Sequence, residues 1–172
     1  MIAKRATPKG NKPSTIKYIK IFDIDGVILS SLHRYATKTV KGKEKLDLDH
    51  WVENQHLCIY DSILPHADIY KKSILSKNTF VIIATSRLLM ADDYMTIGKL
   101  LGMPDSLVSR LHDEQDTQKM KIKGIERIIN DCNLQHVKPF NITMYEDNIN
   151  NLKSICDYFQ CNGVYVPSKQ GH

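Results

Sequence analysis

The chain has 172 residues, of which 42% are hydrophobic and 25% are charged, and its formal net charge at pH 7 is +5. This composition excludes a disordered or fibrous protein, and the length suits one domain with a single core. No apolar run approaches the ~20 residues of a membrane span, and the N-terminus lacks the apolar stretch of a secretory signal. We therefore predict a cytoplasmic protein with no membrane partner.

The first residues differ in composition from the rest of the chain. Residues 1–15 are rich in Pro, Gly, Ser and Lys, which predicts a flexible basic leader ahead of a single domain at 16–172. Cations concentrate at this end, where all those before the first acidic residue are Lys4, Arg5, Lys9, Lys12, Lys17 and Lys20. Such asymmetry suits a polyanionic partner, and a solvated tail explains it equally well. The four cysteines have no zinc-ligand spacing and are interpreted as reduced packing thiols.

Strand-like and helix-like segments alternate along the chain. The strand candidates are short, apolar or alternating runs at residues 17–23, 80–84, 107–111, 140–145 and 163–166. Between them, helical spacing of apolar residues marks 91–101, a helix capped by Asp116 and Thr117, and 149–159. The predicted fold class is α/β, with a Rossmann-like parallel sheet covered by helices on both faces.

Polar residues follow three of these predicted strands. They are Asp23 with Asp25, Thr85 with Arg87, and Glu146 with Asp147. Because ligands bind beyond the carboxyl ends of parallel strands, we expect these clusters to converge on one crevice. Asp23-Ile-Asp25-Gly26 also fits the start of a calcium loop, but a calcium loop needs more oxygen ligands, and apolar residues follow Gly26 instead.

Four motifs in this order resemble the haloacid dehalogenase-like phosphatase superfamily. They are Asp23-Ile-Asp25-Gly-Val, Thr85 after a hydrophobic strand, a helix-opening lysine best matched by Lys119, and the pair Glu146-Asp147. The resemblance implies a small cap or none, Asp23 as nucleophile, Asp25 as general acid and base, and Thr85 and Lys119 as phosphate-holding groups. It also implies Mg²⁺ as cofactor, bound by Asp23, the Asp25 backbone carbonyl, Glu146 and Asp147.

Each role has a simpler structural alternative. Asp25 and Thr85 are residue types that cap turns and helices, and Lys119 competes with Lys121 and Lys123, which lie within the same helical segment. Trp51 and the seven histidines show no functional spacing and are expected in packing or at the surface.

Further matches resemble the phosphatase domain of phage-type polynucleotide kinase-phosphatases. Arg34 lies nine residues after Asp25, where that family carries an active-site arginine, and Thr85-Ser86-Arg87 matches its triplet with Ser86 in place of glycine. The stretch around Asp116 resembles its third motif. The resemblance assigns Arg34, Ser86, Arg87 and Asp116 to substrate binding, since guanidinium groups clasp phosphate oxygens with two hydrogen bonds.

The resemblance implies removal of 3′-phosphate from nucleic acid ends. It also suggests that the cytoplasm in which the protein acts is that of a virus-infected host cell. No Gly-rich kinase loop accompanies it. Two alternatives are open for the basic residues. Either a lysine cluster attracts the nucleic-acid backbone or it is a solvated face, and either Arg34 and Arg87 clasp phosphate or they make structural ion pairs; the lysines are Lys38, Lys41, Lys43 and Lys45. The competing functions are a nucleotidase or other small-metabolite phosphatase, and a non-catalytic nucleic-acid-binding module. Residues 30–79 are predicted to hold a small flap or helical insert.

Overall fold

The computed structural model describes residues 15–111 and 116–168. Its centre is a five-stranded sheet in the order β7-β6-β1-β8-β9, and every pair of neighbours is parallel. The strands are β1 (Tyr18–Phe22), β6 (Thr79–Leu88), β7 (Ser106–Arg110), β8 (Ile142–Glu146) and β9 (Asn162–Tyr165). The predicted parallel α/β fold is confirmed. The predicted leader at 1–15 lies outside the described residues except for Thr15, so it stays a prediction.

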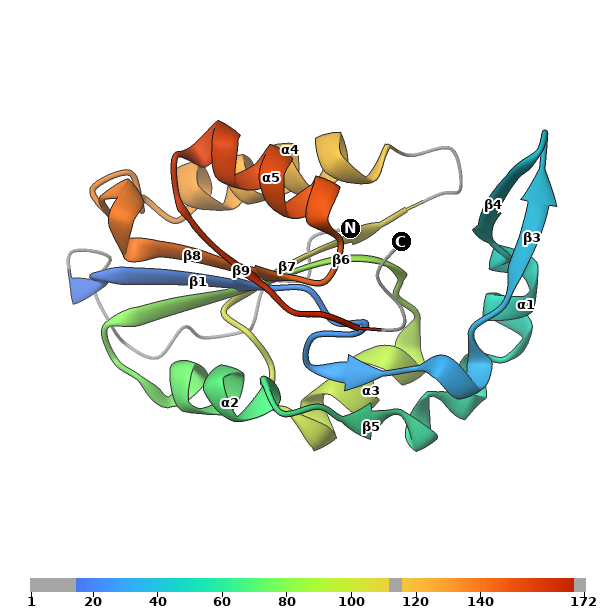
Figure 1. Cartoon of the computed structure of the whole chain (residues 1–172). Helices are drawn as coiled ribbons and strands as arrows, with labels where there is room; N and C mark the ends of the chain where they lie inside the picture. Colours follow the sequence, from blue (N-terminus) through green and yellow to red (C-terminus); the bar gives the residue numbers. More distant parts are fainter. Residues whose placement is uncertain (1–14, 112–115, 169–172) are drawn as a thin grey trace.

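Helices cover both faces of the sheet (Figure 1). One face packs against α4 (Thr117–Asp131) and α5 (Ile149–Phe159), through a core that includes Ile125, Ile128 and Ile155. The other face packs against α2 (Ala67–Leu75) and α3 (Ala91–Leu100), through a second core that includes Tyr70 and Ile97. The helical spacing read from the sequence predicts α3, α4 and α5, whereas α2 was not identified from it.

The strand predicted at 80–84 is longer in the structure. β6 runs on through Leu88, so Thr85, Ser86 and Arg87 lie within the strand and not after it. Its register against β7 shifts between Ala84 and Leu88. Such an irregularity re-aims side chains near the end of a strand. The triplet therefore still reaches the carboxyl edge of the sheet, where the ligand crevice was expected.

The segment between β1 and α2 forms an insert rather than a large cap. After the short strand β2 (Leu29–Ser30) it contains η2 (Leu32–Arg34), the hairpin β3 (Thr37–Val40) and β4 (Lys43–Leu46), α1 (Leu48–Glu53), η3 (Gln55–Tyr60) and β5 (Ser62–Ile63). The hairpin turns at Lys41 and Gly42, whose φ angles are +52° and +75°. Two positive φ angles mark a type I′ turn, which matches the twist of the paired strands.

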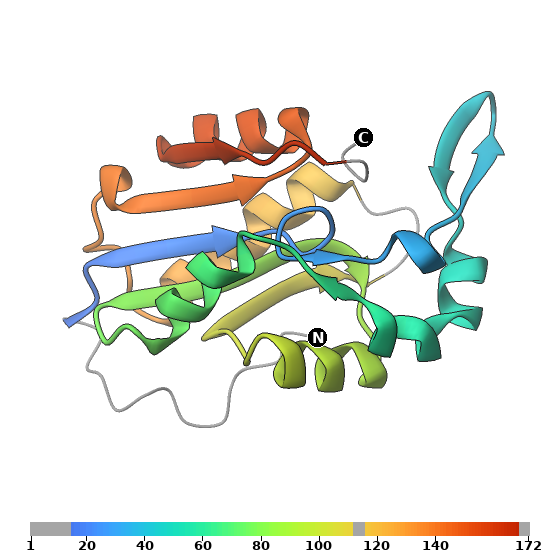
Figure 2. The ribbon, with the colours of Figure 1, turned by 60° about the horizontal axis from the view of Figure 1, so that its bottom comes forward.

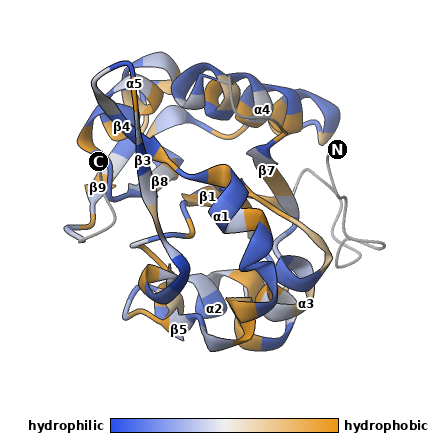
Figure 3. Ribbon diagram, turned by 90° about the vertical axis from the view of Figure 1, so that its right-hand side faces the viewer, coloured by the Kyte–Doolittle hydropathy of each residue, from blue (hydrophilic) through white to orange (hydrophobic). Residues whose placement is uncertain are grey.

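The insert stands beyond the carboxyl ends of the sheet strands (Figure 2). Figure 3 views the molecule from this side, with β3, β4 and α1 in front of the sheet. The predicted small flap is therefore a β-hairpin with one short helix. Among the described residues, no helix is both long and apolar enough to cross a membrane.

Candidate active site

The loop after β1 places the first carboxylates at the carboxyl edge of the sheet. The backbone N–H of Asp23 donates to the Tyr145 carbonyl at 2.9 Å, and its carboxylate Oδ1 accepts from the Ile24 N–H at 2.8 Å. The chain then turns at Gly26, whose φ is +78°; a Cβ added there would lie 2.1 Å from Asp147 Oδ2. Glycine, which has no Cβ, allows the loop to adopt this positive φ and to pass this close to the acidic pair Glu146-Asp147.

A cluster of three carboxylates forms where β1 and β8 end. Asp23, Glu146 and Asp147 are buried, and each offers an oxygen within 4.8 Å of those of the other two. The ammonium of Lys121 enters this carboxylate cluster from α4, with Nζ 2.6 Å from Glu146 Oε2 and 3.3 Å from Asp23 Oδ2. Asp23 and Glu146 thus share one ammonium, and Asp147 accepts a hydrogen bond from the Ser168 hydroxyl.

The electrostatics of the carboxylate cluster show a deficit of positive charge. Burial, followed by the charge of Glu146, raises the pKa of Asp23 well above its ordinary value. Burial and the charge of Asp23 raise the pKa of Asp147 to about 6. Burial alone would lower the pKa of Lys121, but the carboxylates of Asp23 and Glu146 raise it. Mg²⁺ prefers oxygen ligands and few carboxylates, so this donor set fits Mg²⁺.

The position of the lysine corrects the expectation for Lys119. Its side chain is 78% exposed, and its Nζ lies 3.9 Å from Asp116 Oδ2. Two residues further, at 3.6 residues per turn, the helix has rotated by about 200°, which turns Lys121 toward the sheet. Lys121 is fully buried beside Asp23, whereas Lys123 is exposed like Lys119. The structure therefore brings Lys121 to the site and leaves Lys119 in solvent.

A second buried cluster surrounds Arg87. Its guanidinium holds the Asp25 carboxylate through two hydrogen bonds of 3.1 and 2.7 Å, and its Nη1 donates to Asp61 and Asp93 at 2.9 and 3.0 Å. Burial alone would raise the pKa of Asp25, but Arg87 and the hydroxyl of Ser31 hold it below its ordinary value. Arg87 thus fixes the carboxylate of Asp25, and it also lines the cavity.

Arg34 does not reach the cavity, which corrects the expectation that it binds substrate. Its side chain is fully buried and donates to Asp61 at 3.0 and 2.9 Å and to Asp93 at 2.8 Å. The guanidinium carbon lies 4.0 Å from the centre of the Trp51 ring. Arg34, Arg87, Asp25, Asp61 and Asp93 are called the arginine network below. In it Arg34 makes the structural ion pairs that the sequence left open as its alternative.

The other predicted substrate residues do line the cavity. Thr85 is buried, and its Oγ1 accepts from the Arg87 N–H at 3.1 Å. The Ser86 carbonyl accepts from Arg110 Nε at 2.9 Å. Asp116 caps α4 by accepting the Lys119 N–H at 3.0 Å, so it has both a capping role and a place in the cavity wall.

The cavity has a volume of about 510 Å³ and joins the two clusters to the insert. Its lining includes Asp23, Asp25, Thr85, Glu146 and Asp147, and the insert contributes Tyr35, Glu44, Lys45, Leu46, Leu48 and Trp51. Sequence analysis predicted an insert at 30–79 but did not identify its cavity-lining residues, and it missed Asp61 and Asp93. Isolated acidic residues give no periodic signal, and Trp51 was expected only in packing or at the surface.

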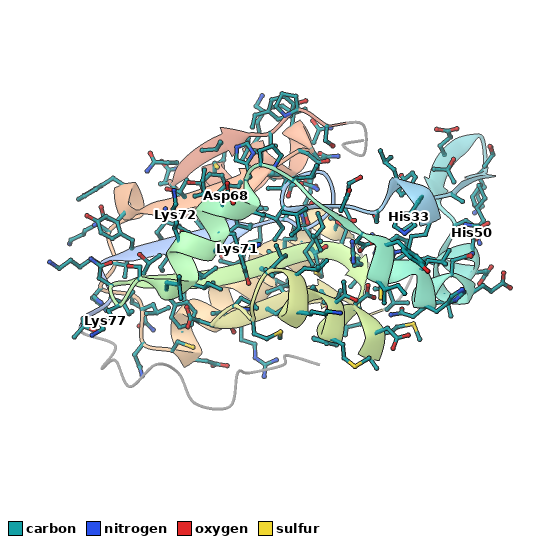
Figure 4. The ribbon with its side chains drawn as sticks, turned by 90° about the horizontal axis from the view of Figure 1, so that it is seen from below. His33, His50, Asp68, Lys71, Lys72 and Lys77 are labelled. Carbon is teal, nitrogen blue, oxygen red and sulfur yellow. The ribbon has the colours of Figure 1, made fainter. Side chains whose placement is uncertain are left out.

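No histidine of the described residues lines the cavity, although His33 Nε2 lies 3.7 Å from Asp61 Oδ1. Figure 4 shows His33 and His50 in the insert, and Lys71, Lys72 and Lys77 at the opposite end of the molecule. His33 contacts the Leu57 carbonyl at 2.9 Å. In the hairpin, Lys38 pairs with Asp47 and Asp49 at 3.2 and 3.0 Å, so part of the predicted basic cluster is neutralised locally.

Comparison with solved structures shows the fold of haloacid dehalogenase-like hydrolases. A protein of that family from Streptococcus pneumoniae matches with a TM-score of 0.56 at 10% identity, over 91% of this chain and 89% of that one. The corresponding domain of the effector Lem4 from Legionella pneumophila gives 0.54 at 11%, over 90% and 88%. A chain of the Pnkp1/Rnl/Hen1 RNA repair complex gives 0.55 at 11%, over 98% of this chain and 48% of that one. The predicted haloacid dehalogenase-like fold is confirmed.

Comparison of sequences is more specific. The 5′-deoxynucleotidase of Escherichia phage T5 is 32% identical over 96 residues, which cover 53% of this chain and 39% of that protein. The match thus spans about two fifths of the relative's length. Residues 10–148 match the family described as bacteriophage T5 5′-deoxynucleotidase, and this range includes all four motifs. The description of this family agrees with the predicted class, a phosphoric monoester hydrolase. The chain belongs to the bacteriophage T5 5′-deoxynucleotidase family.

Proposed function

We propose that the protein is a Mg²⁺-dependent 5′-nucleotidase that removes phosphate from deoxynucleoside monophosphates. The observation that carries this proposal is the buried carboxylate cluster of Asp23, Glu146 and Asp147 with Lys121, within the range matched to the family. The adjoining cavity, about 510 Å³, falls within the ~300–1,000 Å³ typical of sites for one small molecule.

In the first half-reaction, a carboxylate oxygen of Asp23 attacks phosphorus while the bond from phosphorus to the leaving oxygen breaks. Asp25 gives that oxygen its proton, and the nucleoside departs as an alcohol. Lys121 and the Thr85 hydroxyl stabilise the charge on the transferring group. Asp23, the Asp25 backbone carbonyl and Asp147, supported by Glu146, would hold Mg²⁺, which neutralises phosphate oxygens when bound.

In the second half-reaction, water attacks the aspartyl-phosphate, Asp25 takes the proton of that water, and Asp23 is regenerated as inorganic phosphate leaves. Arg87 stabilises the anionic form of Asp25, which this step requires. For the first step Asp25 must be protonated, and the negative charge of the bound substrate phosphate favours that form.

Removal of 3′-phosphate from nucleic acid ends is a second candidate. Arg87 lines the cavity and supports it, and the hairpin lysines would attract a phosphate backbone. The second arginine of this resemblance, Arg34, pairs with Asp61 and Asp93. Arg34 was the residue that favoured the polynucleotide phosphatases over other phosphatases, and these ion pairs favour a structural role for it instead. The family match therefore favours the mononucleotide.

A substrate panel separates the two candidates. Phosphate release should be measured from dTMP, thymidine 3′-monophosphate, and oligothymidylates phosphorylated at the 3′ or the 5′ end, with Asp23→Asn as the background control. We expect the highest kcat/KM for dTMP and no turnover in Asp23→Asn, because an amide is not an anionic nucleophile. Preference for the 3′-phosphorylated oligonucleotide would replace the nucleotidase with the second candidate.

The covalent step has its own readout. Brief reaction with ³²P-labelled substrate followed by acid quenching should leave label on the wild-type protein, and peptide mapping should locate it at Asp23. Turnover without any trapped label, or label on another residue, would contradict the role proposed for Asp23.

A further inference from the structure

The insert contributes cavity-lining residues to which the proposed phosphoryl transfer assigns no role, and two of them, Glu44 and Lys45, are charged. Four of its lining residues are aromatic or aliphatic: Tyr35, Leu46, Leu48 and Trp51. They come from the connection before β3, from β4 and from α1, which stand together beyond the sheet edge (Figure 1). We name these four residues the apolar wall.

The apolar wall is partly accessible and partly fixed. Tyr35 and Leu46 are half-buried, so each keeps surface exposed toward the cavity that they line. Trp51 is 2% exposed; its indole N–H donates to the Leu88 carbonyl at 3.3 Å, and Arg34 lies against its ring. Trp51 and Leu48 are therefore the buried part of the apolar wall, and Tyr35 and Leu46 are the part that a ligand in the cavity would contact.

Other residues of the cavity lining are polar. Arg110 is anchored to the Ser86 carbonyl and to the Thr117 hydroxyl at 2.9 Å each, and Asp116 and Thr117 also line the cavity. An occupant that contacts both sets of residues must offer a flat apolar face to the apolar wall and polar edges to the polar lining. A phosphate group or a sugar phosphate offers no such face, whereas a nucleobase offers both.

We propose that the apolar wall is a nucleobase subsite, in which the base of a nucleoside 5′-monophosphate packs on Tyr35 and Leu46 while its phosphate lies at Asp23. This inference rests on the proposed function and deepens it, because it assigns recognition of the base to the insert. The arginine network ties the two parts together, since Asp61 of the insert and Asp93 of α3 both hold Arg87, which holds Asp25.

Trp51 provides a direct test, because it is the only tryptophan and it lines the cavity. Binding is measured through its fluorescence in full-length Asp23→Asn, titrated in Mg²⁺ with dTMP, dAMP, 2-deoxyribose 5-phosphate and inorganic phosphate. Stacking of a base on an aromatic residue contributes ~1–3 kcal/mol, so we expect both nucleotides to bind on the order of 10- to 100-fold more tightly than 2-deoxyribose 5-phosphate. Equal affinities would overturn the proposal.

Variants locate the effect. Tyr35→Ala and Leu46→Ser should each reduce the advantage of dTMP over 2-deoxyribose 5-phosphate by on the order of 10-fold, and Tyr35→Phe should retain it. Val52→Ala is the matched control, since Val52 is an exposed apolar residue of α1 outside the cavity lining. Circular dichroism identifies any variant that fails to fold. An unchanged advantage in folded Tyr35→Ala and Leu46→Ser would overturn the subsite.

Catalysis by the wild-type protein separates this inference from the proposed function. Base-dependent binding without hydrolysis of dTMP would refute the nucleotidase and leave the subsite supported. Hydrolysis of dTMP and 2-deoxyribose 5-phosphate with equal kcat/KM would support the phosphatase chemistry and overturn the subsite.

Discussion

Two buried charged clusters lie side by side at the carboxyl edge of the sheet, and they are balanced differently. In the carboxylate cluster, Asp23 and Glu146 share the ammonium of Lys121, and the neighbouring Asp147 accepts from the Ser168 hydroxyl. In the arginine network, Asp25, Asp61 and Asp93 share two guanidinium groups through multiple hydrogen bonds of 2.7–3.1 Å.

The difference between the clusters indicates what each one does. Buried charge without a partner is costly, so the carboxylate cluster favours an added cation, and that cation would offset the repulsion between the carboxylates and a substrate phosphate. The carboxylates of the arginine network are already paired, although Arg34 Nη1 is buried without a hydrogen-bond partner among the described residues. We therefore propose that the arginine network holds the insert and Asp25 in place, and that the carboxylate cluster binds the cation.

Removal of divalent cations should have the largest effect, and it should act on the carboxylate cluster. Chelation with EDTA is expected to abolish phosphate release, and added Mg²⁺ is expected to restore it, because the single ammonium of Lys121 does not balance the charge of three carboxylates. Mg²⁺ at 100 times its Kd should also stabilise the fold by about 2.7 kcal/mol, measured as a rise in Tm. Asp147→Asn should lose most of this rise, whereas Asp131→Asn at the surface of α4 should keep it. A wild-type Tm indifferent to Mg²⁺ would argue against the site.

Replacement of a single lysine of α4 should have the next largest effect on activity. Lys121→Met should lower kcat on the order of 10²- to 10³-fold, the loss typical of one group that stabilises transition-state charge. Lys119→Met removes an equal charge from a solvent-exposed position two residues away and should leave kcat within about twofold of wild type. Steady-state kinetics with dTMP measures both. If Lys119→Met proved the more damaging change, the assignment from the structure would be wrong.

Disruption of the arginine network at Arg34 should have the smallest effect on substrate binding and a large one on stability. Arg34→Met leaves Asp61 and Asp93 short of a buried partner, which typically costs about 3–5 kcal/mol, measured by urea denaturation. The KM of the protein that remains folded should change by no more than about twofold. A raised KM with unchanged stability would instead mean that Arg34 contacts substrate, and it would restore the polynucleotide interpretation.

The sequence predicted those features that short-range patterns specify. Alternating apolar strands and helical spacing predicted the parallel sheet and three of its covering helices, because burial on two faces constrains residue type locally. Asp23 and Glu146-Asp147 lie at the carboxyl ends of apolar strands, and Thr85 lies near the carboxyl end of another, so the parallel arrangement brings them to one edge. The hairpin β3–β4 was not predicted, because polar strands such as these give a weak signal even with Lys41-Gly42 between them.

Tertiary structure alone decided which cation serves which carboxylate. The sequence does not distinguish Lys119, Lys121 and Lys123, which are lysines of the same helix. Only the orientation of α4 against the sheet makes Lys121 the buried one. Arg34 and Arg87 both fit a phosphate clasp by sequence, yet Asp61 and Asp93, distant from both motifs, enclose the first and steady the second. Ion pairing depends on distances of a few ångströms between segments far apart in the chain, and no local pattern specifies those distances.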